Sequence, residues 1–118
     1  MAEDVDFQSE DLGSYTVVRA IGYLDFSTSP RLREKLHQVI ETAPRVILLD
    51  LGQIEFLDSS ALGVILNAWK QMQADDATLA LLSPQPRITK IFEITALNLS
   101  IRIFSSLDEA RAELGLAG

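Results

Sequence analysis

The chain alternates between short apolar runs, typical of strands, and longer stretches in which apolar residues recur every three or four positions, as in helices. Val5 and Phe7 alternate with polar neighbours, and a turn signal over residues 10–14 follows them. Residues 15–21 are β-branched and apolar, which favours a strand. We therefore expect a short edge strand within the acidic segment 1–12, joined by a hairpin to a strand over residues 15–21.

The middle of the chain predicts a helix followed by a buried strand. Ser29 is expected to be the N-cap of the helix, with Pro30 at its first position, and Pro44 marks its end. Residues 46–51 form an almost wholly apolar run, as expected for a central strand covered on both faces. The apolar residues of the helix fall on one stripe: Leu32, Leu36, Val39 and Ile40.

The second half of the chain continues the alternation of predicted helices and strands. It predicts a helix over about 59–74, a turn at 75–76, a strand over 78–82, a helix opened by Ser83 and Pro84, a strand over 99–104, and a last helix ending near Gly115. Ser106 and Glu109 are spaced as a capping box for that last helix.

The resulting β(β)αβαβαβα order predicts an α/β fold. We expect a mixed, mostly parallel sheet of four to five strands with about four helices. The 118 residues and 47% hydrophobic content fit a single domain over residues 1–118, with its core over about 5–114.

Composition narrows the classes of function. The chain has no cysteine, which excludes disulfides, thiolate chemistry and cysteine metal sites. With 10 basic and 17 acidic residues its net charge is −7, which argues against nucleic acid and against direct membrane contact. No secretory signal is visible at the start, and no apolar run approaches the roughly 20 residues that span a bilayer. We therefore expect a cytoplasmic protein.

Signals of enzymatic chemistry are weak. His37 is the only histidine and lies inside the first predicted helix, most simply as a partly exposed side chain. Neither a Gly-x-Ser-x-Gly elbow nor a glycine-rich phosphate loop is present, and no carboxylate or histidine cluster has the spacing of metal ligands. We expect no enzymatic activity, no cofactor and no metal.

Two polar clusters follow predicted strands. Asp58, Ser59 and Ser60 stand at a helix start, and Asp25, Ser27 and Thr28 follow the second strand. The simplest interpretation is that these are cap and turn residues. Both clusters nevertheless lie at the carboxyl ends of strands, where α/β sheets bind ligands, so we expect Asp25 near Ser59. Because the first N–H groups of a helix lack partners, a phosphate on Ser59 has a natural site there, adding about −1.5 to −2 charges.

At these residues the chain resembles the STAS domain of the bacterial anti-sigma factor antagonist family. The resemblance covers about residues 5–114. Ala61 and Ala96 stand where the family often has glycine, and residues 75–76 occupy a turn that is often glycine-rich. The matching motifs are an apolar strand over 46–51, a short loop over 52–57, Asp58-Ser59-Ser60-Ala61-Leu62-Gly63, the earlier Gly22-Tyr23-Leu24-Asp25, and Ser83-Pro84 with Ile91-Phe92 and Leu97.

The resemblance implies a phosphorylation switch. The unphosphorylated antagonist binds an anti-sigma factor, which is also a serine kinase with a histidine-kinase-like ATPase fold, and thereby frees a sigma factor. Phosphorylation of Ser59 breaks the complex, and a PP2C-type phosphatase resets it. The protein is then a substrate and a binding protein. The residues expected to support the phosphosite or the partner contact are Asp25, Ser27, Asp58 and Ser60, with Gly63 allowing close approach of a partner or a strand, and Tyr23 and Phe26 as aromatic anchors or core residues.

A second hypothesis is a constitutive STAS subunit of a transporter or signalling assembly. The intact Asp58-Ser59-Ser60 sequence favours the switch, because a constitutive subunit needs no phosphorylatable serine.

Overall fold

Strands and helices alternate along the chain as the hydrophobic pattern predicts. The computed structural model describes residues 4–83 and 85–117. The elements are β1 (Val5–Asp11), β2 (Thr16–Leu24), α1 (Ser29–Ile40), β3 (Val46–Leu57), α2 (Ser59–Ala74), β4 (Thr78–Leu82), α3 (Pro86–Ile94), the 3-10 helix η1 (Leu97–Leu99), β5 (Ile103–Phe104) and α4 (Leu107–Leu114). No helix in this described part is both long and apolar enough to cross a membrane.

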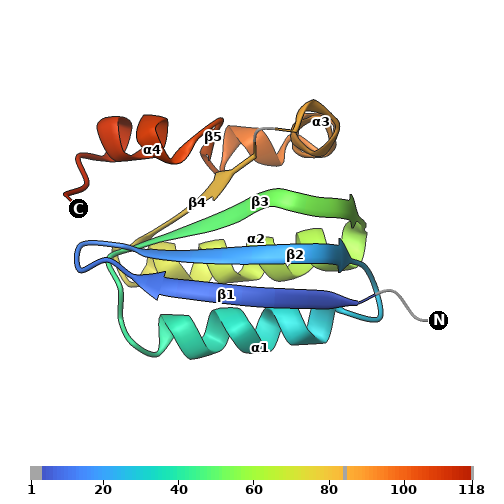
Figure 1. Ribbon diagram of the computed structural model, residues 1–118, viewed down its shortest axis with the longest axis horizontal. Helices are drawn as coiled ribbons and strands as arrows, with labels where there is room; N and C mark the ends of the chain where they lie inside the picture. Colours follow the sequence, from blue (N-terminus) through green and yellow to red (C-terminus); the bar gives the residue numbers. More distant parts are fainter. Residues whose placement is uncertain (1–3, 84, 118) are drawn as a thin grey trace.

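The five strands form one mixed sheet in the order β1-β2-β3-β4-β5, so neighbours in sequence are neighbours in space (Figure 1). β1 runs antiparallel to β2, with Val5 opposite Gly22 and Asp11 opposite Thr16. The other pairs are parallel. The predicted hairpin and the predicted mostly parallel sheet are both confirmed.

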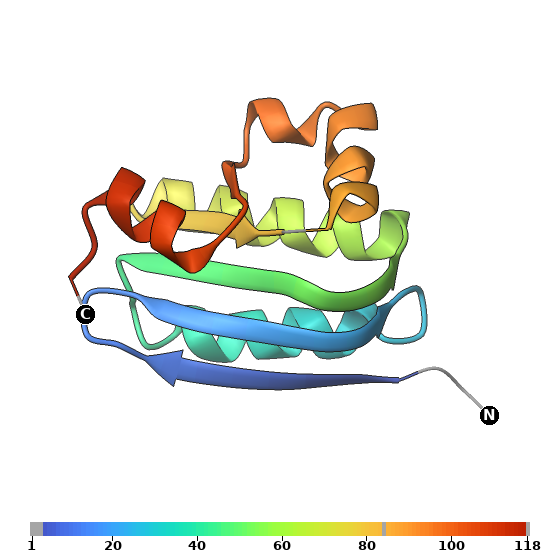
Figure 2. The same ribbon diagram turned by 45° about the horizontal axis from the view of Figure 1, so that its top comes forward.

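Helices cover both faces of the sheet (Figure 2). The larger core lies between one face and α1, α2 and α3, whereas α4 closes a smaller core on the opposite face. In β3, Ile47 and Leu49 belong to the larger core, and Leu48 between them belongs to the smaller one. Burial on both faces explains why this strand is an unbroken apolar run.

β3 is longer than the sequence predicts, because the segment 52–57 that was expected to be a loop continues the strand to Leu57. β4 pairs only with Val46–Asp50, so the rest of β3 projects beyond it. The side-chain amide of Gln85 donates to the carbonyls of Leu51, Gly52 and Ile54 at 3.2, 2.9 and 2.9 Å. A distant side chain therefore supplies the donors that a neighbouring strand would provide.

The first helix also begins differently from the prediction. β2 runs on to Leu24 rather than ending at Ile21, and the N-cap of α1 is Thr28 rather than Ser29. The hydroxyl of Thr28 forms no capping bond; it accepts from the Asp25 amide at 2.9 Å and donates to the carbonyl of Tyr23 at 2.7 Å.

Three boundaries differ near the C-terminus. α3 begins at Pro86 with Gln85 as its N-cap, so Ser83 does not open it, and Pro84 lies outside the described residues. β5 comprises only Ile103–Phe104, the two residues that pair with β4, and η1 takes Leu99 from the predicted strand. Ser106 caps α4 by accepting from the Glu109 amide at 3.1 Å, but the Glu109 carboxylate accepts from Ser105 Oγ. Only half of the predicted capping box therefore forms.

Candidate functional site

Two loops lie side by side at the carboxyl ends of β2 and β3. The amide of Asp58 donates to the carbonyl of Leu24 at 3.1 Å, and the amide of Phe26 donates to Asp58 Oδ2 at 3.0 Å. Because β2 and β3 are parallel neighbours, the loops that follow them must leave from the same edge of the sheet. The hydrogen bonds of the Asp25 carboxylate stay within its own loop and do not reach Ser59.

Asp58 is the residue that joins the two loops. Its backbone is extended, and its Oδ1 accepts from the amides of Ser60 at 2.9 Å and Ala61 at 3.2 Å. Its other oxygen, Oδ2, accepts from the Phe26 amide in the neighbouring β2–α1 loop. The N-cap interpretation of this residue is therefore correct, and the carboxylate also fixes the neighbouring loop.

This geometry changes the expected surroundings of a phosphate on Ser59. The amides of Ser60 and Ala61, which lack partners in an uncapped helix, are already bonded to Asp58. The Leu62 amide bonds the Asp58 carbonyl at 3.1 Å. A phosphate at this position would therefore meet the fixed carboxylate of Asp58 and would find two of the first amides of the helix already bonded.

The hydroxyl of Ser59 is available for chemistry. Ser59 is exposed at the first position of α2, and its hydroxyl makes no hydrogen bond to residues 4–83 or 85–117, whereas Ser60 is half-buried. Gly63, one turn further on, is also exposed, and a Cβ there would meet nothing within 4 Å. No strand of the described chain therefore packs closely against Gly63.

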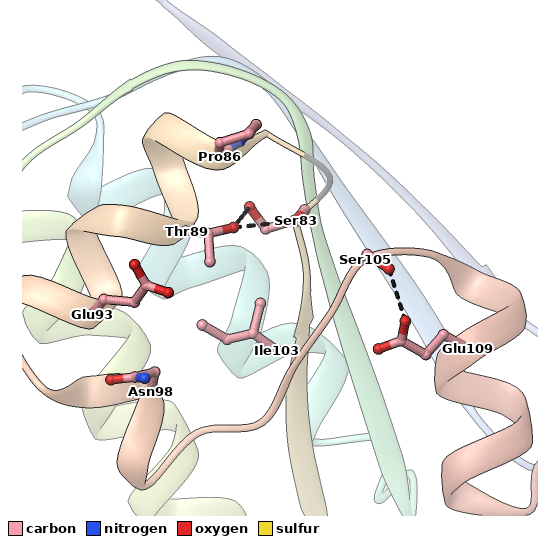
Figure 3. Close-up of a pocket in the computed structure, with 8 residues that line it drawn as sticks. All are labelled: Ser83, Pro86, Thr89, Glu93, Asn98, Ile103, Ser105 and Glu109. Atoms are coloured by element: carbon pink, nitrogen blue, oxygen red, sulfur yellow. Dashed lines mark hydrogen bonds between the residues drawn. The ribbon is translucent and has the colours of Figure 1, made fainter.

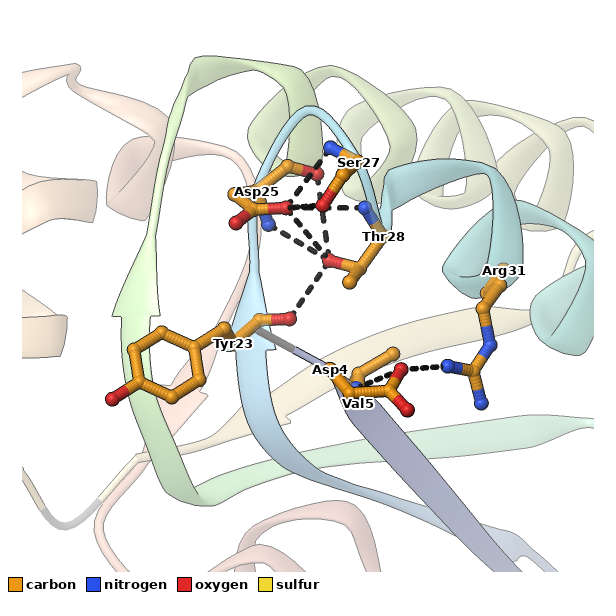
Figure 4. A network of polar contacts seen from close by, with 7 residues as sticks. All are labelled: Asp4, Val5, Tyr23, Asp25, Ser27, Thr28 and Arg31. Carbon is orange, nitrogen blue, oxygen red and sulfur yellow. Dashed lines mark hydrogen bonds and ion pairs between the residues drawn. The ribbon is translucent and has the colours of Figure 1, made fainter. Parts of the chain in front are cut away.

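Asp25 closes the β2–α1 loop on itself (Figure 4). Its Oδ1 accepts from the Ser27 hydroxyl at 2.7 Å, from the Ser27 amide at 2.9 Å and from the Thr28 amide at 3.1 Å. The Ser27 hydroxyl, followed by the Thr28 and Ser27 amides, holds the pKa of this carboxyl below its ordinary value because each stabilises the charged form. Desolvation opposes this shift without reversing it.

Thr28 anchors this loop to the sheet. Its side chain is buried, and its hydroxyl accepts from the Asp25 amide at 2.9 Å while donating to the carbonyl of Tyr23. The sequence identifies Thr28 only as a turn or cap residue. Its role depends on a buried position that no local pattern reveals.

Aromatic side chains surround the two loops. Phe26 is 71% exposed and Phe56 is 48% exposed, which is unusual for large apolar residues. Tyr23 is half-buried and lies opposite Phe56 in the sheet register. An open hollow of about 530 Å³ lies among Asp25, Phe26, Ser27 and Asp58. Sequence reasoning found Phe26 but missed Phe56, because that residue lay in a segment predicted to be a loop.

A second hollow, of about 490 Å³, lies at the carboxyl ends of β4 and β5 between α3 and α4 (Figure 3). Its hydroxyls are bonded internally: Thr89 Oγ1 to Ser83 Oγ at 3.1 Å, and Ser105 Oγ to Glu109 at 2.7 Å. Neither a histidine nor a lysine lines it. The Ser–His pair of many nucleophilic sites is therefore absent from the described residues that line this hollow.

His37 is exposed on α1 and lies in neither of these two hollows. Within the described residues no group of three or more histidine, aspartate or glutamate side chains is placed to hold a metal ion.

Comparison with proteins of known sequence finds regulators of sigma factors. A segment of 68 residues is 37% identical to a putative anti-sigma factor antagonist of Thermotoga neapolitana, covering 58% of this chain and 60% of that protein. An anti-sigma-B factor antagonist of Listeria monocytogenes is 32% identical over 83 residues, covering 70% of this chain and 72% of that protein.

Comparison with solved structures finds the same fold. An anti-sigma factor antagonist from Mycobacterium paratuberculosis superposes with a TM-score of 0.88 at 21% identity, over 95% of each chain. The Bacillus cell fate determinant SpoIIAA in its phosphorylated form superposes with a TM-score of 0.70 at 25% identity, over 92% of this chain and 99% of that one.

The sheet order, the two loops at the ends of β2 and β3, and these likenesses point to one family. The model of that family, described as the STAS domain, matches residues 6–110, which is most of the chain. The chain belongs to the STAS domain family.

Proposed function

We propose that this protein is an anti-sigma factor antagonist, which binds an anti-sigma factor in its unphosphorylated form and thereby frees a sigma factor. The relative from Listeria carries that name. In this proposal the anti-sigma factor is also a serine kinase with a histidine-kinase-like ATPase fold, Ser59 is its substrate, and a PP2C-type phosphatase removes the phosphate. The protein itself acts by binding and catalyses no reaction.

The observation that carries the proposal is the contrast between Ser59 and Asp58. The Ser59 hydroxyl supports nothing in the fold, so a kinase can modify it without unfolding the domain. The Asp58 carboxylate next to it is held by three amides and cannot turn away from a new phosphate. Phosphorylation therefore concentrates negative charge on one small exposed surface.

The size of this effect is sufficient for a switch. Placing about −2 charges in a desolvated contact beside an existing carboxylate costs several kcal/mol through repulsion and desolvation. Each 1.4 kcal/mol is about tenfold in affinity, so a loss of about 3 kcal/mol weakens binding by roughly two orders of magnitude.

The surrounding residues supply the contact itself. Phe26, Phe56 and the half-buried Tyr23 offer aromatic area of the kind that dominates protein interfaces. Gly63 lets the partner approach the helix backbone one turn beyond Ser59. Asp25 and Ser27 hold the loop that presents Phe26.

The first experiment compares what wild-type, Ser59→Glu and Ser59→Ala baits capture from lysate of the native host. We expect wild type and Ser59→Ala to capture a histidine-kinase-like ATPase and Ser59→Glu to lose it. Addition of ATP should then release wild type but not Ser59→Ala. Release of Ser59→Ala by ATP would place the phosphosite elsewhere. Transporter subunits captured equally by all three baits would favour the constitutive role.

Asp25 offers a second test of the same proposal. We expect Asp25→Asn to impair phosphorylation of Ser59 or binding of the captured factor more than it lowers the melting temperature. Kinase assays and calorimetric binding on the purified pair measure the first two quantities, and thermal denaturation measures the third. A large loss of melting temperature with normal binding would assign Asp25 a purely structural role.

A further inference from the structure

Helices α1 and α2 contain more basic than acidic residues, in contrast to the whole chain. Together they carry four basic residues and one acidic residue, whereas the whole chain has 10 basic and 17 acidic residues. Arg31 is paired with Asp4. The basic side chains on these helices without an ion pair in the described part of the chain are Arg33, Lys35 and Lys70.

An exposed stripe of α2 begins at the candidate phosphosite. Ser59, Gly63, Asn67 and Gln71 recur every four residues along α2, and all four are exposed. Residues four apart lie one above the other on a helix face. The stripe that begins at Ser59 therefore continues along the exposed side of α2, and its far half borders α1.

A groove lies where that stripe meets α1. Its floor is apolar and buried, formed by Leu36, Val64 and Ala68. Its rim carries hydrogen-bond donors, Arg33 and His37 from α1 and Asn67 and Gln71 from α2. Neither Arg33 nor His37 forms a hydrogen bond or ion pair through its side chain within residues 4–83 and 85–117.

The size of the groove distinguishes between kinds of ligand. Its volume is about 210 Å³. Pockets for cofactors and small molecules usually measure about 300–1,000 Å³, so this groove suits one or two side chains of a protein partner. The chain's net charge of −7 argues against nucleic acid. An arginine on the rim and an apolar floor together match a carboxylate on an aliphatic stem.

We propose that the α1–α2 groove extends the docking surface of Ser59 and receives an acidic segment of the anti-sigma factor, with a carboxylate of that segment at Arg33. This inference rests on the proposed function and adds the chemistry of the partner. Asn67 lies eight residues beyond Ser59, about 12 Å along the helix axis. That separation exceeds the Debye length of about 8–10 Å, so a phosphate on Ser59 is largely screened from a carboxylate at Arg33 and acts mainly on the part of the contact around Ser59.

The test uses the full-length protein and the purified anti-sigma factor captured by wild type. Calorimetric titration compares wild type with Arg33→Glu and with Arg45→Glu, a matched control. Arg45 is exposed, makes no side-chain ion pair in the described chain, and directly precedes β3 at the amino-terminal edge of the sheet. Both variants change the net charge equally. We expect Arg33→Glu to weaken binding about tenfold or more and Arg45→Glu less than about threefold. Raising salt from about 0.05 to about 0.3 M should weaken wild type more than Arg33→Glu.

Other outcomes separate this inference from the proposed function. If Arg33→Glu binds as well as Arg45→Glu while Ser59→Glu does not bind, the groove inference is wrong and the proposed function stands. If wild type binds no anti-sigma factor, both are wrong. Melting curves check that each variant is folded. Should Arg33→Glu unfold, the pair Arg33→Gln and Arg45→Gln carries the same comparison.

Discussion

The two carboxylates at the candidate site hold their loops in different ways. Asp25 accepts hydrogen bonds only from its own loop, from Ser27 and Thr28. Asp58 accepts from its own helix and also from Phe26 across the gap. The β2–α1 loop is held by bonds within itself, and the β3–α2 loop is bonded to it through Asp58. The Ser59 hydroxyl takes part in neither set of bonds. The proposed phosphorylation site therefore lies beside the hydrogen-bonded loops and takes part in none of their bonds.

The largest effect is expected from a substitution at Gly22, which lies in β2 shortly before the first loop. Gly22 has φ +115°, and a Cβ there would overlap the carbonyl oxygen of Asp4, which accepts from the Tyr23 amide at 3.0 Å. Gly22→Ala must therefore strain the backbone and displace the start of β1, costing about 3 kcal/mol of unfolding free energy. Urea denaturation measures the loss. Gly13→Ala is the control, since Gly13 also has positive φ, +88°, but open space around it. Equal losses in the two variants would contradict the steric argument.

The next effect tests whether Asp58 really joins the loops. Asp58→Ala leaves the amides of Ser60, Ala61 and Phe26 without the carboxylate, and we expect a loss of about 2 kcal/mol. Ser106→Ala removes an N-cap that accepts one amide and should cost about 1 kcal/mol. Amide NMR shifts locate the change. Perturbations confined to α2, with Phe26 and Ser27 unmoved, would mean that the loops are independent.

A smaller effect is expected on the pKa of Asp25. Its pKa in the folded protein lies below the ordinary value of 3.8, chiefly because of the Ser27 hydroxyl. A lowered carboxyl pKa stabilises the fold above pH 3.8, and that contribution is lost as the pH falls through the folded pKa. Carboxyl NMR titration should therefore show a midpoint below 3.8 that Ser27→Ala moves upward. A wild-type midpoint at or above that value would contradict the hydrogen-bonded loop.

The smallest effect is expected at Ser59 itself. Ser59→Ala removes a hydroxyl without a partner in the described structure, so the unfolding free energy should change by no more than about 0.5 kcal/mol. Urea denaturation alongside Asp58→Ala provides the measurement. A loss comparable to that of Asp58→Ala would show that the Ser59 hydroxyl helps to stabilise the fold. The proposed contrast between a structural Asp58 and a free Ser59 hydroxyl would then be wrong.

Much of the fold follows from local patterns. The bounds of α2 (Ser59–Ala74) and β4 (Thr78–Leu82) agree with the prediction, because strong periodicity and an N-cap or a turn mark each end. The extension of β3 through residues 52–57 does not follow from its sequence. Those residues are strand because β2 pairs with one side and the side chain of Gln85 with the other, and both partners are distant along the chain.

Some features of the candidate site also follow from the sequence, and others do not. The parallel order of the strands was enough to place the Asp25 and Asp58 loops at one edge. The buried hydroxyl of Thr28 and the exposed ring of Phe56 were missed, because each depends on which neighbours cover it. The pairing of the first α2 amides with Asp58, which alters the surroundings of Ser59, is likewise visible only in three dimensions.

The part of β3 that projects beyond β4 has a consequence for how the protein behaves at high concentration. An uncovered strand edge is a template for pairing with another molecule, and such pairing leads to aggregation. Here the side chains of Gln85 and Arg87 cover part of the β3 edge. Gln85 occupies three of the carbonyls, and Arg87 donates both to the Glu55 carbonyl and to Gln85 Oε1. A glutamine and an arginine therefore fill the hydrogen-bonding positions that a neighbouring strand would otherwise occupy. Deamidation of that one glutamine would put a carboxylate against the carbonyls and reopen the edge.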